Sequence, residues 1–185
     1  MLALDIRGLG NAVTEMSVVE LSQLAMIVAT VLAFGTLAWR REDDRRFGVL
    51  AAGLFACMVI REMDAALDLL QDGLWQVLAT AVAVGCLTYS LRDRRSTLRG
   101  LANFLGSTPG KLMLLALAIL LVYSRLIGMG LLWRGLLEEQ YLRIFKNAVE
   151  ESAELLGYVL ILVSAISHAT RRLSAPPEKG SLLDS

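Results

Sequence analysis

The stretch NAVEESAELLGYVLILVSAISHA, residues 147–169, decides the fold class of this 185-residue chain. It is long enough to cross the hydrocarbon core of a bilayer as one helix, which takes about 20 residues. Its first third nevertheless carries three acids, Glu150, Glu151 and Glu154. Carboxylates are costly inside a bilayer, so a span of this kind predicts a polar interior that other helices share with it.

Four further apolar segments of spanning length occur in the chain, and hydrophobic residues make up 56% of the sequence. Soluble domains of this size are normally more polar, and the alternating ten-residue segments of a membrane β-barrel are not seen. The sequence therefore predicts an all-α, polytopic membrane bundle. The five predicted spans are residues 17–39, 47–67, 73–91, 112–133 and 147–169.

We expect residues 1–173 to form a single transmembrane bundle. Residues 174–185 contain two prolines and few apolar residues, which is typical of a disordered tail. The chain leaves no room for a separate soluble domain.

Basic residues in the connections predict the orientation, because cytoplasmic loops are enriched in Lys and Arg. The connections after the first and third spans, together with the tail, hold twelve basic residues, whereas the remaining connections and the N-terminal segment hold four. This asymmetry predicts an outside N-terminus and a cytoplasmic C-terminus. Arg outnumbers Lys 15 to 3, which favours a bacterial chain, and we therefore expect a multi-pass protein of the bacterial inner (plasma) membrane.

The longest connection, residues 92–111, carries five basic residues and one acid. Leu101, Phe104 and Leu105 predict a short amphipathic turn on the membrane surface. We expect the basic residues at 92–99 to contact anionic lipid head groups. The formal net charge of zero gives no indication of a nucleic-acid partner.

With this orientation, the charged residues inside the predicted spans all fall in the outer half of the bundle. Helices rise about 1.5 Å per residue, which places most of these charges within about 10 Å of the outer ends of their spans. The residues expected to bind a cation or polar solute are Glu62, Asp64, Glu150 and Glu154, with Glu151 and Glu20 beside them, Arg61 and Arg125 as counter-charges, and Tyr158 and Asn147 as supporting polar groups.

Helical spacing arranges these residues in stripes. Glu154 and Tyr158 continue a polar face that begins near the start of the fifth span, while Arg61, Asp64 and Asp68 share one face of the second. Six acids against two arginines leave four negative charges, which a dry interior does not hold in ionised form. Either some acids are protonated, or water reaches them, or a cation binds.

Three interpretations of this cluster stay open. In the first, it is an outward-facing site that binds or passes a cation, a proton or a small polar solute. In the second, the protein is a non-catalytic accessory subunit of a membrane complex, or forms a homo-oligomer. The charges of the cluster then pair with one another or with charges of the partner. The third, less favoured, is a lipid-head-group enzyme that uses the carboxylates as acid and base. No nucleophile elbow, P-loop or dinucleotide fingerprint is present, so the sequence leans away from an enzyme.

The residue types also limit the cofactors. If a metal binds, its ligands are oxygens, which suit Mg²⁺, Ca²⁺ or Mn²⁺ rather than zinc. The single histidine, His168, is expected as an interfacial residue at a helix C-terminus, and one histidine cannot provide a bis-histidine haem site. Cys57 and Cys86 lie within apolar segments and are expected as small core residues rather than as a disulfide.

Overall fold

A computed structural model describes residues 18–124, 126 and 139–176, and within these residues every regular element is a helix. The all-α prediction is therefore confirmed for the described part of the chain. The elements are α2 (Val18–Arg40), α3 (Arg45–Glu62), α4 (Asp64–Asp68), α5 (Leu74–Leu91), α6 (Arg94–Gly106), α7 (Thr108–Ala118), the π-helical segment η1 (Ile119–Tyr123) and α10 (Glu139–Ser174). Most of the predicted tail, residues 177–185, lies outside the described residues.

Three helical stretches are long and apolar enough to cross a membrane: Val19–Arg40, Leu74–Leu91 and Val149–Ser174. A fourth is reached if Arg94–Gly106 and Thr108–Tyr123, which are bent by 85°, count as one broken span. The helix α3 does not join this set, because its 18 residues carry charged side chains near both ends. The five-span count therefore stays a prediction.

The second predicted span, residues 47–67, differs from the structure at its C-terminal end. The helix α3 ends at Glu62, where the Met63 backbone N–H bonds to the carbonyls of Val59 and Ile60, and the short helix α4 follows. The predicted span extends five residues beyond the end of α3 because apolar residues continue past this break. The fifth predicted span, residues 147–169, is shorter than the helix at both ends, since α10 has 36 residues and is about 54 Å long.

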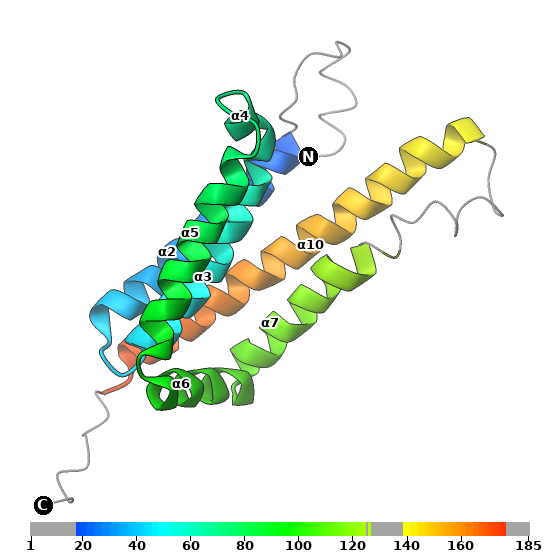
Figure 1. Cartoon of the computed structure of the whole chain (residues 1–185). Helices are drawn as coiled ribbons and strands as arrows, with labels where there is room; N and C mark the ends of the chain where they lie inside the picture. Colours follow the sequence, from blue (N-terminus) through cyan, green and yellow to red (C-terminus); the bar gives the residue numbers. More distant parts are fainter. Residues whose placement is uncertain (1–17, 125, 127–138, 177–185) are drawn as a thin grey trace, which may run out of the picture.

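The long helices form a row in the order α5, α3, α2, α10 and α7, in which each helix packs on the next (Figure 1). The helix α6 crosses one end of the row, where it contacts α3 and α7. The row stays open, because its two ends, α5 and α7, are not among the helix pairs that pack closely. We call the end that holds α6 the α6 end and the opposite end, where α4 lies, the α4 end.

The aromatic core lies near the α6 end and is centred on Phe34, which is fully buried. Its ring stacks on Phe55 at 5.9 Å and meets Phe47 and Phe104 edge-on, each at 6.0 Å between ring centroids. The imidazole of His168 joins this cluster 4.7 Å from Phe104 and is only 5% exposed. His168 is therefore a core residue, and α10 continues six residues past it to Ser174. Its expected depth at the membrane interface stays a prediction.

A corner built from side-chain caps sets the direction of α7. The Ser107 hydroxyl donates to the Phe104 carbonyl at 2.6 Å and accepts the Gly110 N–H at 3.2 Å. Ser164 of α10 donates to the Pro109 carbonyl at 2.6 Å, in a buried position. These bonds attach the start of α7 to α10 and satisfy backbone groups that the 85° turn would otherwise leave unpaired.

An ion pair closes the α6 end between α10 and the turn that joins α2 to α3. Arg172 donates to both carboxylate oxygens of Asp44, at 2.6 and 2.9 Å, and the Asp44 side chain is only 4% exposed. The α6 end is therefore apolar and aromatic, and it is closed by an ion pair.

Both cysteines are free and partly buried. Cys57 lies on α3 and Cys86 lies on α5, and these two helices pack against each other.

Candidate functional site

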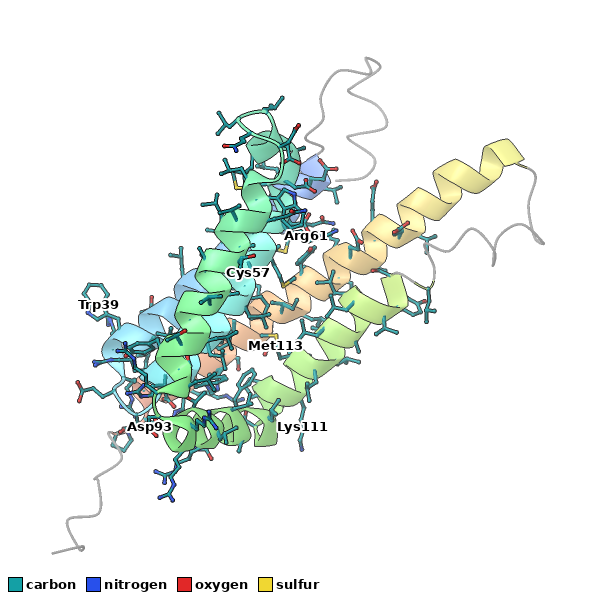
Figure 2. All side chains as sticks on the ribbon, viewed as in Figure 1. Trp39, Cys57, Arg61, Asp93, Lys111 and Met113 are labelled. Atoms are coloured by element: carbon teal, nitrogen blue, oxygen red, sulfur yellow. The ribbon has the colours of Figure 1, made fainter. Side chains whose placement is uncertain are left out.

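The last turn of α3 forms the centre of the candidate site, near the α4 end (Figure 2 labels Arg61). The Arg61 guanidinium lies 3.1 Å from Oε1 of Glu62, and the Tyr158 hydroxyl of α10 donates to the same oxygen at 2.9 Å. Tyr158 is 4% exposed, whereas the Glu62 side chain is 28% exposed. Glu62 therefore joins a buried phenol to a partly exposed arginine across two helices.

These groups line a cleft of about 340 Å³, which we call the polar cleft. It contains one guanidinium, two carboxylates and one phenol, set among apolar side chains. Its lining residues are Met58, Arg61 and Glu62 of α3, Leu120 and Leu121 of η1, and Glu154 and Tyr158 of α10.

A second cleft, of about 350 Å³, lies at the end of the bundle between α2, α3 and α4, and we call it the α4-end cleft. Three carboxylates, Glu20, Glu62 and Asp64, line it together with apolar residues. Asp64 is exposed, and its carboxylate also accepts the N–H of Ala65. Glu62 lines both clefts and so forms the wall between them.

The structure thus places four of the six predicted acids, together with Arg61 and Tyr158, around two clefts that share Glu62. Glu150 and Glu151 are partly buried on α10 and are not among the residues that line either cleft. Arg125 and the side chain of Asn147 lie outside the described residues. Their predicted roles stay predictions.

The predicted stripe of Arg61, Asp64 and Asp68 is wrong as a continuous helical face. The helix breaks at Met63, so Arg61 lies on α3 and the two aspartates lie on α4. Asp68 takes part in a turn instead, because its carboxylate accepts the Gly73 N–H at 3.0 Å beside the positive φ of 77° at that glycine. Met63 at the break and several residues after it line the α4-end cleft.

The π-helical segment η1 was not predicted, and it adjoins the polar cleft through Leu120 and Leu121. The Ser124 hydroxyl donates to the Leu120 carbonyl at 2.6 Å in a buried position. A Cβ atom at Gly157 would lie 3.1 Å from the Leu120 Cβ, so α10 and η1 approach closely here. Single π-helical turns within α-helices occur frequently at functional sites, because they displace side chains from the regular helical faces.

Sequence reasoning also missed the apolar members of the polar cleft. Met58 precedes Arg61 and Glu62 by three and four residues, which is the spacing of one helical face and was a usable signal. The positions of Leu120 and Leu121 depend on the π-helical turn, which no residue pattern in this chain indicates.

The described residues also limit metal binding. Across residues 18–124, 126 and 139–176, no group of three or more His, Cys, Asp or Glu side chains is arranged to hold a metal ion. In the polar cleft a guanidinium and a phenol already contact the Glu62 carboxylate. These contacts leave fewer lone pairs of Glu62 for an ion, and the possible Mg²⁺, Ca²⁺ or Mn²⁺ ligand stays a prediction.

Comparisons with protein-family models, with curated proteins and with solved structures found no match to this chain, so the argument for function rests on its own residues.

Proposed function

We propose that this chain is a multi-pass protein of the bacterial inner membrane with an outward-facing acidic pocket that binds or passes a cation, a proton or a small polar solute. The observation that carries the proposal is the position of Glu62. It lines both clefts, and it contacts the arginine and the phenol of the polar cleft.

Charge balance supports a positively charged or proton-carrying ligand. Among the described residues, the two clefts are lined by four carboxylates, Glu20, Glu62, Asp64 and Glu154, and by one guanidinium, Arg61. The formal balance is therefore one positive against four negative charges, or minus three. Clefts lined by one sign of charge concentrate ions of the opposite sign.

Three long apolar helices and the distribution of basic residues support the membrane placement. The α6 end holds the arginine-rich connections and the start of α6, whereas the α4 end holds the acidic clefts. In the proposed orientation, with five spans and an outside N-terminus, the α6 end lies in the cytoplasm. The pocket then opens to the outer face.

The second candidate function is that of an accessory subunit or homo-oligomer, and α5 favours it. Of the 18 residues of α5, only Ser90 is buried inside the structure. Its exposed side chains include Val77, Val84 and Leu87. A helix this apolar contacts either lipid or another membrane helix, and copurification of a stoichiometric partner would favour the accessory role over the pocket.

The pocket is tested with the variants Glu62→Gln and Glu154→Gln, purified in detergent. We expect the Tm of the wild type to rise on titration with sodium or methylammonium at constant ionic strength, with a smaller rise for magnesium. A ligand at 100 times its Kd adds about 2.7 kcal/mol of stability, which is a shift of several degrees in a chain of this size. Both variants should lose most of this shift.

The matched control is Asp72→Asn, which removes an exposed carboxylate at the same end of the bundle without altering either cleft. It should keep the full cation-dependent shift. If the wild type shows no shift with any cation and none with pH, the proposed pocket function is wrong.

A further inference from the structure

We propose that the polar cleft holds the head group of one membrane phospholipid with a primary-amine zwitterionic head, and that an acyl chain of this lipid lies along α3 and α7. This inference rests on the proposed pocket function and names the class of its ligand. It is carried by an apolar groove that lies next to the polar cleft along the same two helices, on the side of the α6 end.

The apolar groove has a volume of about 440 Å³ and lies between α3, α6 and α7. Leu50 and Leu54 line it on α3, Leu114 and Leu117 line it on α7, and Phe104 of α6 contributes at its far end. The side chains of Leu54 and Leu114 are 54% and 51% exposed. The mouth of the groove is therefore apolar and opens sideways between two helices that are not packing neighbours, where membrane lipid would lie.

The groove and the polar cleft follow the same face of α3. Ala51 and Phe55 line the groove and Met58 and Glu62 line the cleft, at successive spacings of four, three and four residues, so these four positions share one face of the helix. The distance from Ala51 to Glu62 along the helix is about 17 Å at 1.5 Å per residue. One leaflet of a bilayer has a hydrocarbon thickness of about 15 Å, so this stripe matches the depth that one acyl chain spans.

The opposite wall shows the same continuity. Leu114 and Leu117 of α7 line the apolar groove, and Leu120 and Leu121 of η1 line the polar cleft three and four residues after Leu117. The two spaces therefore follow one another between the same two helical segments, polar near the α4 end and apolar toward the α6 end. An outer-leaflet lipid has the same polarity in the proposed orientation.

The charges of the polar cleft complement a zwitterion. The Arg61 side chain is 55% exposed, and a guanidinium has five N–H donors, which leaves donors for a phosphate beside its contact with Glu62. Both Glu62 and Glu154 line the same space and attract an ammonium group. A primary ammonium donates up to three hydrogen bonds, whereas a trimethylated one donates none, and a head group with only negative charge would face two carboxylates.

The head-group preference is tested on the purified protein with phosphatidylethanolamine, phosphatidylcholine and phosphatidylglycerol added at equal mole fraction. We expect native mass spectrometry to show about a tenfold preference for the ethanolamine lipid over the choline lipid, as one charged hydrogen bond would produce. Its addition should also raise the Tm most. Equal retention of these two lipids, or preferential retention of phosphatidylglycerol, would overturn the inference.

The chain position is tested with Leu114→Trp, which fills the mouth of the groove, and with Leu115→Trp as its control. Leu115 is 55% exposed on the same helix but does not line the groove. Leu114→Trp should lose the lipid-dependent Tm shift, and Leu115→Trp should keep it. If Leu114→Trp does not fold, Leu54→Trp repeats the test on α3. A lipid-dependent Tm shift as large as that of the wild type in either groove variant would contradict the proposed position of the acyl chain.

The same variants separate this inference from the proposed function. Methylammonium does not need the apolar groove, so Leu114→Trp should retain the cation-dependent Tm shift. If methylammonium stabilises the wild type and no lipid preference is found, only the lipid inference fails. If neither ligand has an effect, both fail.

Discussion

At the scale of single residues, the contact between Tyr158 and Glu62 is the most specific link in the candidate site. It joins α10 to α3 through one oxygen that also contacts Arg61. The sequence predicted that both residues lie at a similar depth in the membrane, whereas their contact depends on how α10 packs in the bundle. The sequence therefore indicated the group of residues, but not which of them touch.

Tyr158→Phe removes the hydroxyl and keeps the ring. We expect a loss of about 1 kcal/mol in the free energy of unfolding, because Glu62 is partly exposed and water can replace the lost donor. Denaturant unfolding in detergent measures this loss. Tyr123→Phe, at a 54% exposed position of η1, is the control and should leave stability unchanged. Equal effects of the two substitutions would show that the Tyr158 bond does not contribute.

Asp44 is the second residue whose environment predicts a large effect. Asp44→Asn removes the carboxylate that Arg172 contacts through two hydrogen bonds at a buried position, and we expect a loss of about 3 kcal/mol in the free energy of unfolding. Glu42→Gln is the control, because the Glu42 carboxylate is 85% exposed and pairs with Arg45 at the surface. Its effect on unfolding should not be measurable. A small loss for Asp44→Asn would mean that the pair does not hold α10 to the α2–α3 turn.

At the scale of elements, the sequence located both ends of α5 and the C-terminal end of α2 to within one residue. Both helices are predominantly apolar and are followed by arginines, so hydropathy and charge together set these limits. The predicted second span extends past the end of α3 because apolar residues continue beyond Met63, and the backbone conformation of Met63, with φ −95° and ψ 14°, is not visible in composition. The π-helical turn of η1 lies where α10 approaches closely at Gly157, a tertiary contact that the sequence does not show.

The corner between α6 and α7 sets the direction in which α7 leaves the α6 end, and Gly110 is its most crowded position. A Cβ atom there would overlap the carbonyl of Phe104. Gly110→Ala should therefore cost about 2 kcal/mol, because backbone must shift to relieve the overlap. Gly106→Ala is the matched control, since nothing lies within 4 Å of its Cβ position. Thermal unfolding compares the two, and equal stability would show that the corner is not closely packed.

At the scale of the whole molecule, the sequence predicted an all-helical chain with several membrane spans, and the described residues agree with that coarser statement. The number of spans and the orientation depend on where charged residues settle relative to a bilayer, so they remain predictions. The open row of helices could not be predicted, because periodicity does not tell which helices become neighbours.

Orientation is tested with single cysteines in a background where Cys57 and Cys86 are replaced by serine. Asp72→Cys, in the connection between α4 and α5, should react with a membrane-impermeant maleimide added to intact cells. Gly180→Cys, in the predicted cytoplasmic tail, should react only after the membrane is opened. Labelling of Gly180→Cys from outside would reverse the proposed orientation.

The most direct test of the central claim, that the polar cleft is a cation-binding pocket open to the outside, is the labelling of Met58→Cys in the same background. Met58 lines the polar cleft, whereas Leu54, one turn away on α3, lines the apolar groove and serves as the control position. A charged, membrane-impermeant thiol reagent added outside should label Met58→Cys but not Leu54→Cys, and methylammonium should slow the reaction. Absence of labelling at Met58→Cys in the folded protein, or labelling only from the cytoplasmic side, would contradict the claim.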